Sequence, residues 1–235
     1  MVSNRQASLS GQLARLGFTN SERAESLLAG PAFDGLRDNP TILEAFSQSA
    51  DPDQALLSLE RVLIAADDQG VRGQLVAALE ADGDFQTQLA LVLGASEALA
   101  EFLARHPEQF LILVDHDLMD TPPTAELLRD EFIAAVTCSS RNQAPWIEGA
   151  TALRIAYRRR LLALAARDLS GHSSFSEVTH ELAHLADAVL AACLELAHCE
   201  LPEDAAPCRI AIISMGKCGG QELNYISDVD VIFVA

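Results

Sequence analysis

Apolar residues recur every three to four positions through most of the first 200 residues, which is the spacing of one helix face. Asp51 and Pro52 predict the start of a helix over residues 54–66, because aspartate accepts hydrogen bonds from the first amides and proline fits the first turn. Ser174 and Glu177 have the spacing of a capping box before another long helix. Most of this region is therefore predicted to be helical.

Further helices are predicted over residues 89–105, 125–138 and 150–169. The first of them should end at Pro107, because proline disfavours helical backbone in the residue before it. Residues 139–145 are polar and predict a loop. Residues 201–207 contain two prolines and two acidic residues, which predict a linker.

The pattern changes after this linker. Residues 210–214 form a continuous apolar run that ends before Gly216, which predicts a strand buried on both faces. The last residues of the sequence are again apolar and predict a second strand that carries Asp228 and Asp230. The two runs predict a small sheet that follows a long helical region.

A glycine-rich turn with one lysine joins the two predicted strands. Gly216, Gly219 and Gly220 allow positive φ and a close approach of the backbone to a ligand. Successive N–H groups of such a turn can bind an anion, and Lys217 adds a positive charge. The turn is not a Walker A loop, because Cys218 stands where serine or threonine is required. By itself it is equally typical of an ordinary strand-to-helix connection.

The two aspartates change this interpretation. Side chains alternate along a strand, so Asp228 and Asp230 should share one face while Val229 and Val231 share the other. Two carboxylates about 7 Å apart can hold Mg²⁺, which prefers oxygen ligands. Ser227 could orient a phosphate or cap the preceding turn. The alternative is a strand edge kept soluble by charge, but the nearby glycine turn favours chemistry at phosphorus.

These residues carry a resemblance to a known family. The sequence MGKCGGQELNY at residues 215–225, followed by SDVD at 227–230, resembles the signature of the glutamine synthetase adenylyltransferase family. That family belongs to the DNA polymerase β-like nucleotidyltransferase superfamily. Four upstream segments are also similar to the family: residues 93–96, 105–108, 157–169 and 185–188.

The resemblance implies a function. Members carry two nucleotidyltransferase domains, of which the first removes AMP from a tyrosine of glutamine synthetase by phosphorolysis, giving ADP, and the second attaches AMP from ATP. This chain corresponds to the first. Asp228 and Asp230 would be catalytic and would bind Mg²⁺. The residues implied to bind nucleotide or phosphate are Gly216, Lys217, Gly219, Gly220 and Ser227.

The implied fold is α+β and predominantly helical. Residues 1–205 would form a helical N-terminal region, and residues 206–235 would begin the nucleotidyltransferase domain. The superfamily places a third carboxylate on a later strand, so we expect little turnover from these 235 residues alone. Implied partners are glutamine synthetase, ATP or ADP, phosphate and a PII-type signal protein.

The composition of the chain limits the cellular locations and the classes of partner that are expected. A net charge of −18 argues against nucleic acid or an anionic membrane as the main partner, because both would repel such a surface. No uninterrupted apolar run reaches the roughly 18 residues of a membrane span. The first residues lack the features of a secretory signal, and the five cysteines form no CxxC pair. We therefore expect a cytoplasmic protein with reduced thiols.

Two other hypotheses remain open. His180, Glu181 and His184 form a literal HExxH, the pattern of a zinc peptidase. However, Glu195 as a third ligand would lie about 22 Å along the helix from His180. The other hypothesis is a helical regulatory module that binds glutamine synthetase or a PII-type protein without chemistry.

Two charged clusters are ambiguous. Arg154 and Arg158 lie on one helix face, and the arginines around them predict either a phosphate clamp or a surface paired with local acids such as Asp168. Asp115 and Asp117 have no glycine turn beside them and are interpreted as loop or helix-start charges.

Overall fold

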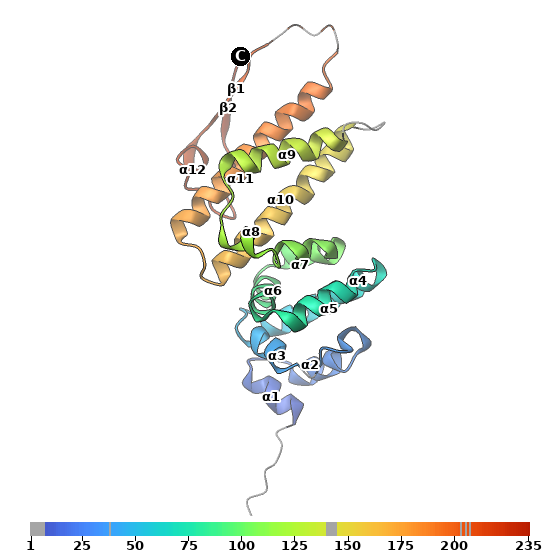
Figure 1. The fold of residues 1–235 in the computed structure, drawn as a ribbon. Helices are drawn as coiled ribbons and strands as arrows, with labels where there is room; N and C mark the ends of the chain where they lie inside the picture. Colours follow the sequence, from blue (N-terminus) through green and yellow to red (C-terminus); the bar gives the residue numbers. More distant parts are fainter. Residues whose placement is uncertain (1–7, 38, 140–144, 203, 205, 207) are drawn as a thin grey trace, which may run out of the picture. The chain divides into compact units, whose positions relative to one another are not determined.

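The computed structural model describes residues 8–37, 39–139, 145–202, 204, 206 and 208–235. Helices make up most of these residues, and one two-stranded sheet lies near the end of the chain (Figure 1). The predicted class, predominantly helical α+β, is confirmed. The chain divides into two compact units, one of Met1–Met119 with Ala165–Ser170 and one of Asp120–Leu164 with Gly171–Ala235.

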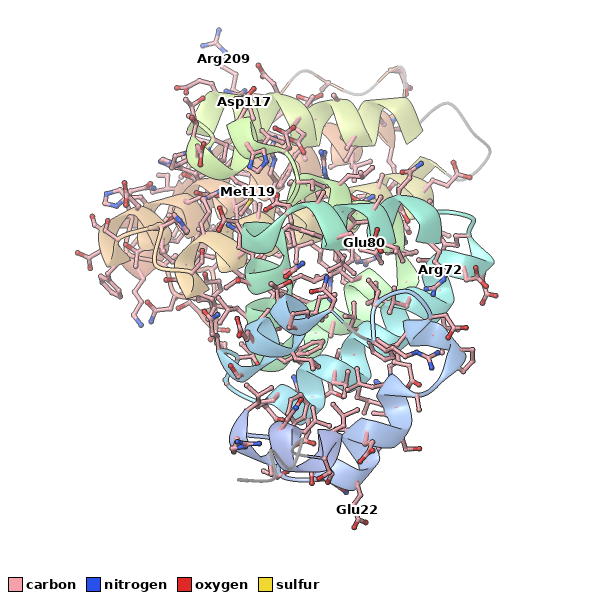
Figure 2. The ribbon with its side chains drawn as sticks, turned by 60° about the horizontal axis from the view of Figure 1, so that its bottom comes forward. Glu22, Arg72, Glu80, Asp117, Met119 and Arg209 are labelled. Atoms are coloured by element: carbon pink, nitrogen blue, oxygen red, sulfur yellow. The ribbon has the colours of Figure 1, made fainter. Side chains whose placement is uncertain are left out.

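The first unit is built from short helices. In chain order they are α1 (Leu9–Arg15), α2 (Ser21–Leu28), η1 (Pro31–Phe33), α3 (Pro40–Ser47), α4 (Pro52–Asp68), α5 (Arg72–Ala81), α6 (Gly83–Ala95), α7 (Glu97–Arg105), η2 (Pro107–Ile112) and α8 (His116–Asp120). Phe33, Phe46, Phe85 and Phe110 are fully buried among leucines in its core. Charged side chains such as Glu22 project away from the ribbon (Figure 2).

Capping residues set several helix boundaries as predicted. Asp51 accepts a hydrogen bond from the Gln54 amide at 2.9 Å and begins α4. The prediction of one helix over residues 89–105 is wrong, because α6 and α7 are separate and bent by 116°. Ser96 lies between them with φ −138° and accepts a hydrogen bond from the Leu99 amide, so it starts a new helix. The predicted end before Pro107 is confirmed.

The second unit combines three long helices with the sheet. It contains α9 (Ala125–Ser139), most of α10 (Pro145–Leu169), α11 (Phe175–Cys199), β1 (Ala211–Ser214), α12 (Gly216–Gly219) and β2 (Val231–Val234). Helix α10 begins earlier than the predicted residue 150. Residues 140–144 of the predicted loop lie outside the described residues. Buried side chains of α9, α10, α11 and the glycine turn share one core, including Leu128, Phe132, Leu164, Leu182, Leu185, Cys218 and Leu223.

Helix α11 has the predicted cap and one apolar stripe along its length. The Glu177 amide donates to the Ser174 hydroxyl at 3.3 Å, and the Ser174 amide donates to the Glu177 carboxylate at 2.7 Å. Leu182, Leu185 and Leu196 of the stripe are buried in the core of the second unit. The reciprocal cap and the buried stripe explain why this segment forms one long helix.

Helix α11 is also long and apolar enough to cross a membrane by length and composition. It has 25 residues, a mean hydropathy of 1.4 in its best window, and 39% of that window buried. The sequence observation concerned uninterrupted apolar runs, whereas this test uses the mean hydropathy of a window that can include polar residues. Helices α6 and α7 pass the same test as a bent pair. Core helices of water-soluble proteins pass the same test, so the result is weak evidence for a membrane-spanning helix.

The sheet differs from the prediction in burial. Strands β1 and β2 are antiparallel, with Ser214 opposite Val231 and Ile213 opposite Ile232. Ile213 and Ile232 are 47% and 49% exposed, so β1 is not buried on both faces. Ser214 and Val231 are half-buried on the other face, where Ser214 contacts α11. The two-stranded sheet of the described residues is thus open on the Ile213 side and only partly covered on the Ser214 side, where Phe233 is 63% exposed.

We predict that Gly94→Ala destabilises the first unit. A methyl group at Gly94 would lie 2.7 Å from the Ser49 Cβ and 2.9 Å from the Asp51 carbonyl oxygen, so helix α6 would have to shift. Overpacking of this kind costs about 1–3 kcal/mol. Urea unfolding followed by far-UV circular dichroism measures the change in unfolding free energy.

The matched control is Gly73→Ala in α5, where nothing lies within 4 Å of the added methyl group. Alanine is the better helix former by about 1 kcal/mol in a helix interior, so this variant should be neutral or more stable. Equal destabilisation by both substitutions would contradict the close packing of α6 at Gly94.

Candidate functional site

The glycine turn begins directly after β1. Gly216 has φ +55°, a conformation that a side chain would strain, as predicted. Gly219 and Gly220 do not have positive φ, so that part of the prediction is wrong. They belong to a helical turn, in which the Gly220 amide donates to the Gly216 carbonyl at 2.9 Å. Gly219 is required for a different reason, because a Cβ there would overlap the Ser214 carbonyl oxygen.

Gln221 ends the turn in a conformation that sequence reasoning did not anticipate. Its φ is +58°, and it is the one described residue other than glycine with positive φ. Such a conformation costs a residue with a side chain roughly 1–2 kcal/mol. The Gln221 side-chain amide donates to the Asp187 carboxylate and to the Cys218 carbonyl, each at 3.4 Å. These contacts hold Gln221 in place.

Asp187 of α11 connects the helix to both ends of the turn. Its carboxylate also accepts a hydrogen bond from the Ser214 hydroxyl at 3.2 Å. Ser214 is the last residue of β1, and Gln221 follows α12. Sequence spacing does not link Asp187 to Ser214 or Gln221, because these residues lie 27 and 34 positions further along the chain. The one signal at Asp187 is the resemblance of residues 185–188 to the family.

Lys217 lies at the exposed side of the turn. Its side chain is open to solvent, and its carbonyl accepts a hydrogen bond from the Glu222 amide at 2.8 Å. The first amide groups of a helical turn have no partner within the helix. A cation and such amides at one place are suited to binding an anion such as phosphate.

The paired aspartates lie just before β2, not within it. Strand β2 begins at Val231, but the Asp230 carbonyl accepts a hydrogen bond from the Met215 amide at 2.8 Å and extends the pairing. The backbone of Asp230 is thereby held next to the residue that precedes Gly216. Both Asp228 and Asp230 are exposed.

The chain alternates around these aspartates as expected for an extended segment. Ser227 and Val229 line a cavity of about 460 Å³ together with α10 and α11, whereas Asp228 and Asp230 do not line it. The Ser227 hydroxyl accepts a hydrogen bond from the Asn224 amide at 3.3 Å. Of the two roles considered for Ser227, the structure shows the capping of the preceding turn.

The aspartates suit a divalent cation by their chemistry. Asp228 and Asp230 offer carboxylate oxygens on an exposed segment, as Mg²⁺ prefers. Across the described residues, no group of three or more histidine, cysteine, aspartate or glutamate side chains could hold a metal ion. Phosphate oxygens and water would complete the coordination, which is the usual arrangement for Mg²⁺ at phosphate sites.

The HExxH residues do not assemble a zinc site in the described part of the chain. His180 is exposed, and its Nδ1 lies 2.6 Å from the Ser176 carbonyl oxygen one turn earlier. Glu181 is 4% exposed, on the buried side of the helix, whereas Glu195 is exposed.

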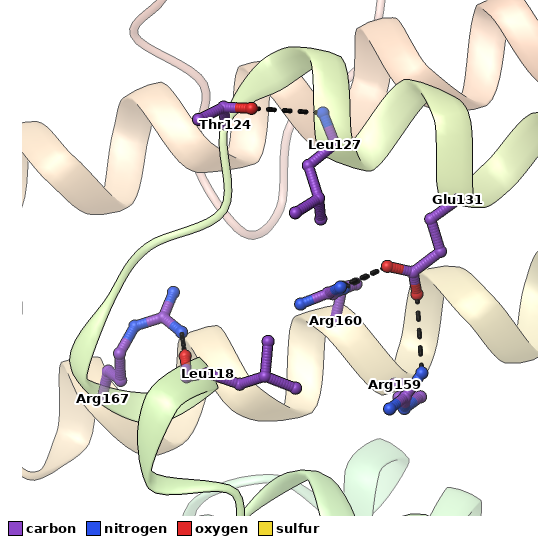
Figure 3. Close-up of polar contacts among 7 residues, drawn as sticks. All are labelled: Leu118, Thr124, Leu127, Glu131, Arg159, Arg160 and Arg167. Carbon is purple, nitrogen blue, oxygen red and sulfur yellow. Dashed lines mark hydrogen bonds and ion pairs between the residues drawn. The ribbon is translucent and has the colours of Figure 1, made fainter.

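The arginine cluster is partly structural (Figure 3). Arg160 is buried and forms an ion pair with Glu131 of α9, and Arg159 lies 3.6 Å from the same carboxylate. Arg167 is 2% exposed and donates to the Leu118 carbonyl at 3.3 Å. Arg154 and Arg158 are exposed. Buried arginines require such partners, because an uncompensated charge in the interior is costly.

Asp115 has the structural role that its position predicted. Its carboxylate accepts a hydrogen bond from the Leu118 amide at 3.2 Å, at the start of α8. Asp117 lies in the first turn of the same helix and is exposed. The chain thus contains a second pair of aspartates with the spacing of Asp228 and Asp230, but at a helix start.

The second unit therefore brings together a strand, a glycine turn with an exposed lysine, and two exposed aspartates beside the turn. This arrangement combines a turn suited to binding an anion with carboxylates suited to Mg²⁺. The family model described as glutamate-ammonia ligase adenylyltransferase matches residues 86–235. The chain belongs to this family.

Individual relatives support the same family assignment. The chain is 47% identical over 234 residues to the bifunctional glutamine synthetase adenylyltransferase/adenylyl-removing enzyme of Streptomyces coelicolor, covering 100% of this chain. It is 44% identical over 230 residues to that of Streptomyces avermitilis, covering 98% of this chain. The Mycobacterium tuberculosis enzyme of the same name is 36% identical over 231 residues, covering 95% of this chain. The chain spans 22% of the length of each of these relatives.

We predict a strong difference in reactivity among the cysteines. Burial raises the pKa of Cys218, the Ser214 hydrogen bond lowers it, and the charge of Asp187 raises it further. Burial also raises the pKa of Cys193. Cys199 and Cys208 are exposed. Because the thiolate is the reactive form, iodoacetamide at neutral pH should label Cys199 and Cys208 at least about tenfold faster than Cys218.

Peptide mass spectrometry after timed labelling measures these rates. Labelling in urea is the control, since the difference should disappear when the chain unfolds. If Cys218 were labelled in the folded protein at the same rate as Cys208, the conclusion that the Cys218 side chain is buried beneath the turn would be wrong.

Proposed function

We propose that this chain begins the domain that removes AMP from the adenylylated tyrosine of glutamine synthetase by phosphorolysis, giving ADP. The observation that carries the proposal is the adjacency of the glycine turn to Asp230, through the Met215 hydrogen bond, in a chain of the adenylyltransferase family. The relatives are named as both adenylyltransferases and adenylyl-removing enzymes. Removal, not attachment, is inferred from the domain order that the family resemblance implies.

In this reaction an oxygen of inorganic phosphate attacks the phosphorus of the adenylyl group. The bond from that phosphorus to the tyrosine oxygen breaks, the tyrosine oxygen takes up a proton, and the products are ADP and free tyrosine. Lys217 and the amides of the glycine turn bind the attacking phosphate and reduce its repulsion from the adenylyl group. Holding both reactants close together supplies much of the acceleration.

Asp228 and Asp230 would hold Mg²⁺ in this proposal. When bound, the ion neutralises phosphate charge and orients the oxygens of the reacting groups. Gly216 leaves open space where a side chain would project, Gly219 lets the turn pack closely against the Ser214 carbonyl, and Gly220 continues the turn. Ser227 positions the aspartates indirectly, since its hydroxyl caps the turn before them.

The wider setting is also part of the proposal. Glutamine synthetase would be the protein substrate, phosphate, ADP and ATP the small ligands, and the cytoplasm the location. A PII-type signal protein is a further candidate partner. The acidic surface, with a net charge of −18, supports an assignment without nucleic acid or membrane partners. A binding module without chemistry is the rival, and Mg²⁺ dependence separates the two.

We predict that Asp228→Asn combined with Asp230→Asn abolishes ADP release. The assay uses the protein at its full natural length with adenylylated glutamine synthetase, Mg²⁺ and phosphate. Loss of both carboxylates removes the proposed ligands of the cation, so activity should fall by roughly 1,000-fold or more. ADP release is followed by a coupled assay at several Mg²⁺ concentrations.

The matched control is Asp115→Asn combined with Asp117→Asn, which makes the same charge change at the same spacing. Asparagine still accepts the capping hydrogen bond at position 115, so this variant should retain folding and activity. Undiminished ADP release from the Asp228/Asp230 variant would refute the assignment of these two residues. No release from the unaltered protein would favour AMP attachment or a binding role.

We also predict that Lys217→Gln raises the KM for phosphate by roughly tenfold, because one charge-assisted contact is worth about 1.5–3 kcal/mol. Arg209→Gln removes an exposed cation from the same part of the chain and is the control (Figure 2). Steady-state rates at varied phosphate measure both variants. An identical KM change in the two would mean that net charge, not a contact from Lys217, sets phosphate affinity.

A further inference from the structure

We propose that Asp187 is a positioning residue for the glycine turn and that it acts through Gln221. This inference deepens the proposed function and rests on it, because it concerns the same phosphate-binding turn. Asp187 lies on α11, outside the segment that contains the glycines and the aspartates. Its carboxylate contacts Ser214, the last residue of β1, and Gln221, which follows α12.

The first argument is geometric. One oxygen of Asp187 accepts from the Ser214 hydroxyl at 3.2 Å and the other accepts from the Gln221 amide at 3.4 Å. A single side chain therefore fixes both ends of the turn. Asp187 is half-buried, and its neighbours Ala186 and Ala188 are buried in the core of the second unit. The carboxylate is thus presented from a rigid helix that packs beside α12 and the sheet (Figure 1).

The second argument is the backbone of Gln221. Left-handed backbone is unfavourable for glutamine and persists only where the surroundings enforce it. The Gln221 side chain contacts Asp187 and the Cys218 carbonyl, so it joins the helix to the inside of the turn. Without Asp187, the left-handed conformation would lose a main support, and relaxation of Gln221 would reorient the preceding peptide groups.

The third argument is the buried side of the turn. Cys218 is 1% exposed and packs in the core that contains Leu182 and Leu185 of α11. Core packing holds this side of the turn, while the Asp187 contacts hold its ends. Lys217, next in sequence to the anchored Cys218, then faces solvent at a defined position. Loss of Asp187 should leave the protein folded but the anion-binding side of the turn less well ordered.

The test compares Asp187→Ala, Gln221→Ala and the double variant in the protein at its full natural length. Each single variant should raise the KM for phosphate by roughly tenfold, with kcat changed by less than about threefold. If the two residues act as one unit, the double variant should be no worse than either single variant. Glu195→Ala, at an exposed acid of the same helix, is the matched control and should leave KM unchanged.

A second readout does not depend on activity. Iodoacetamide should label Cys218 faster in Asp187→Ala and Gln221→Ala than in Glu195→Ala, because a loosened turn exposes this thiol. Additive KM changes, or a fall in melting temperature with unchanged KM and unchanged Cys218 labelling, would overturn the positioning role. If the unaltered protein releases no ADP, the proposed function fails, and the labelling rates alone decide whether Asp187 orders the turn.

Discussion

The attachment of the glycine turn to helix α11 is the constraint on which the rest of the candidate site depends. One stripe of this helix packs into the core of the second unit, and Asp187 beside that stripe bonds to Ser214 and Gln221. A two-stranded sheet is only marginally stable alone. The helix therefore supplies the rigidity that the short strands lack, and it places the turn and the aspartates at one location.

The residues of the glycine turn have different structural roles. Gly216 is needed for left-handed backbone, whereas Gly219 is needed because the Ser214 carbonyl lies too close for a side chain. Gln221 adopts left-handed backbone without being glycine and is held by hydrogen bonds. Strained residues of this kind are common where a protein must hold its backbone against a ligand, which fits the proposed phosphate-binding role of the turn.

The features of the fold that the sequence predicts well are helix boundaries set by neighbouring residues. The caps at Asp51 and Ser174 and the helix end before Pro107 depend on neighbouring residues only, and the structure has them as expected. The break at Ser96 was missed, because the apolar pattern continues through it and a single serine competes weakly with that signal. The open face of the sheet was also missed, because an apolar run does not reveal what covers it.

The residue types of the candidate site can be read from the sequence alone. The sequence supplies the glycines, Lys217 and the pair Asp228 and Asp230, because these residue types and their spacing follow the chain. The distant groups that support these residues become visible only once the helices are packed together. Asp187 reaches the turn, and Glu131 pairs with Arg160, through contacts between segments far apart in sequence. Such contacts follow from how the helices pack, and no local periodicity encodes them.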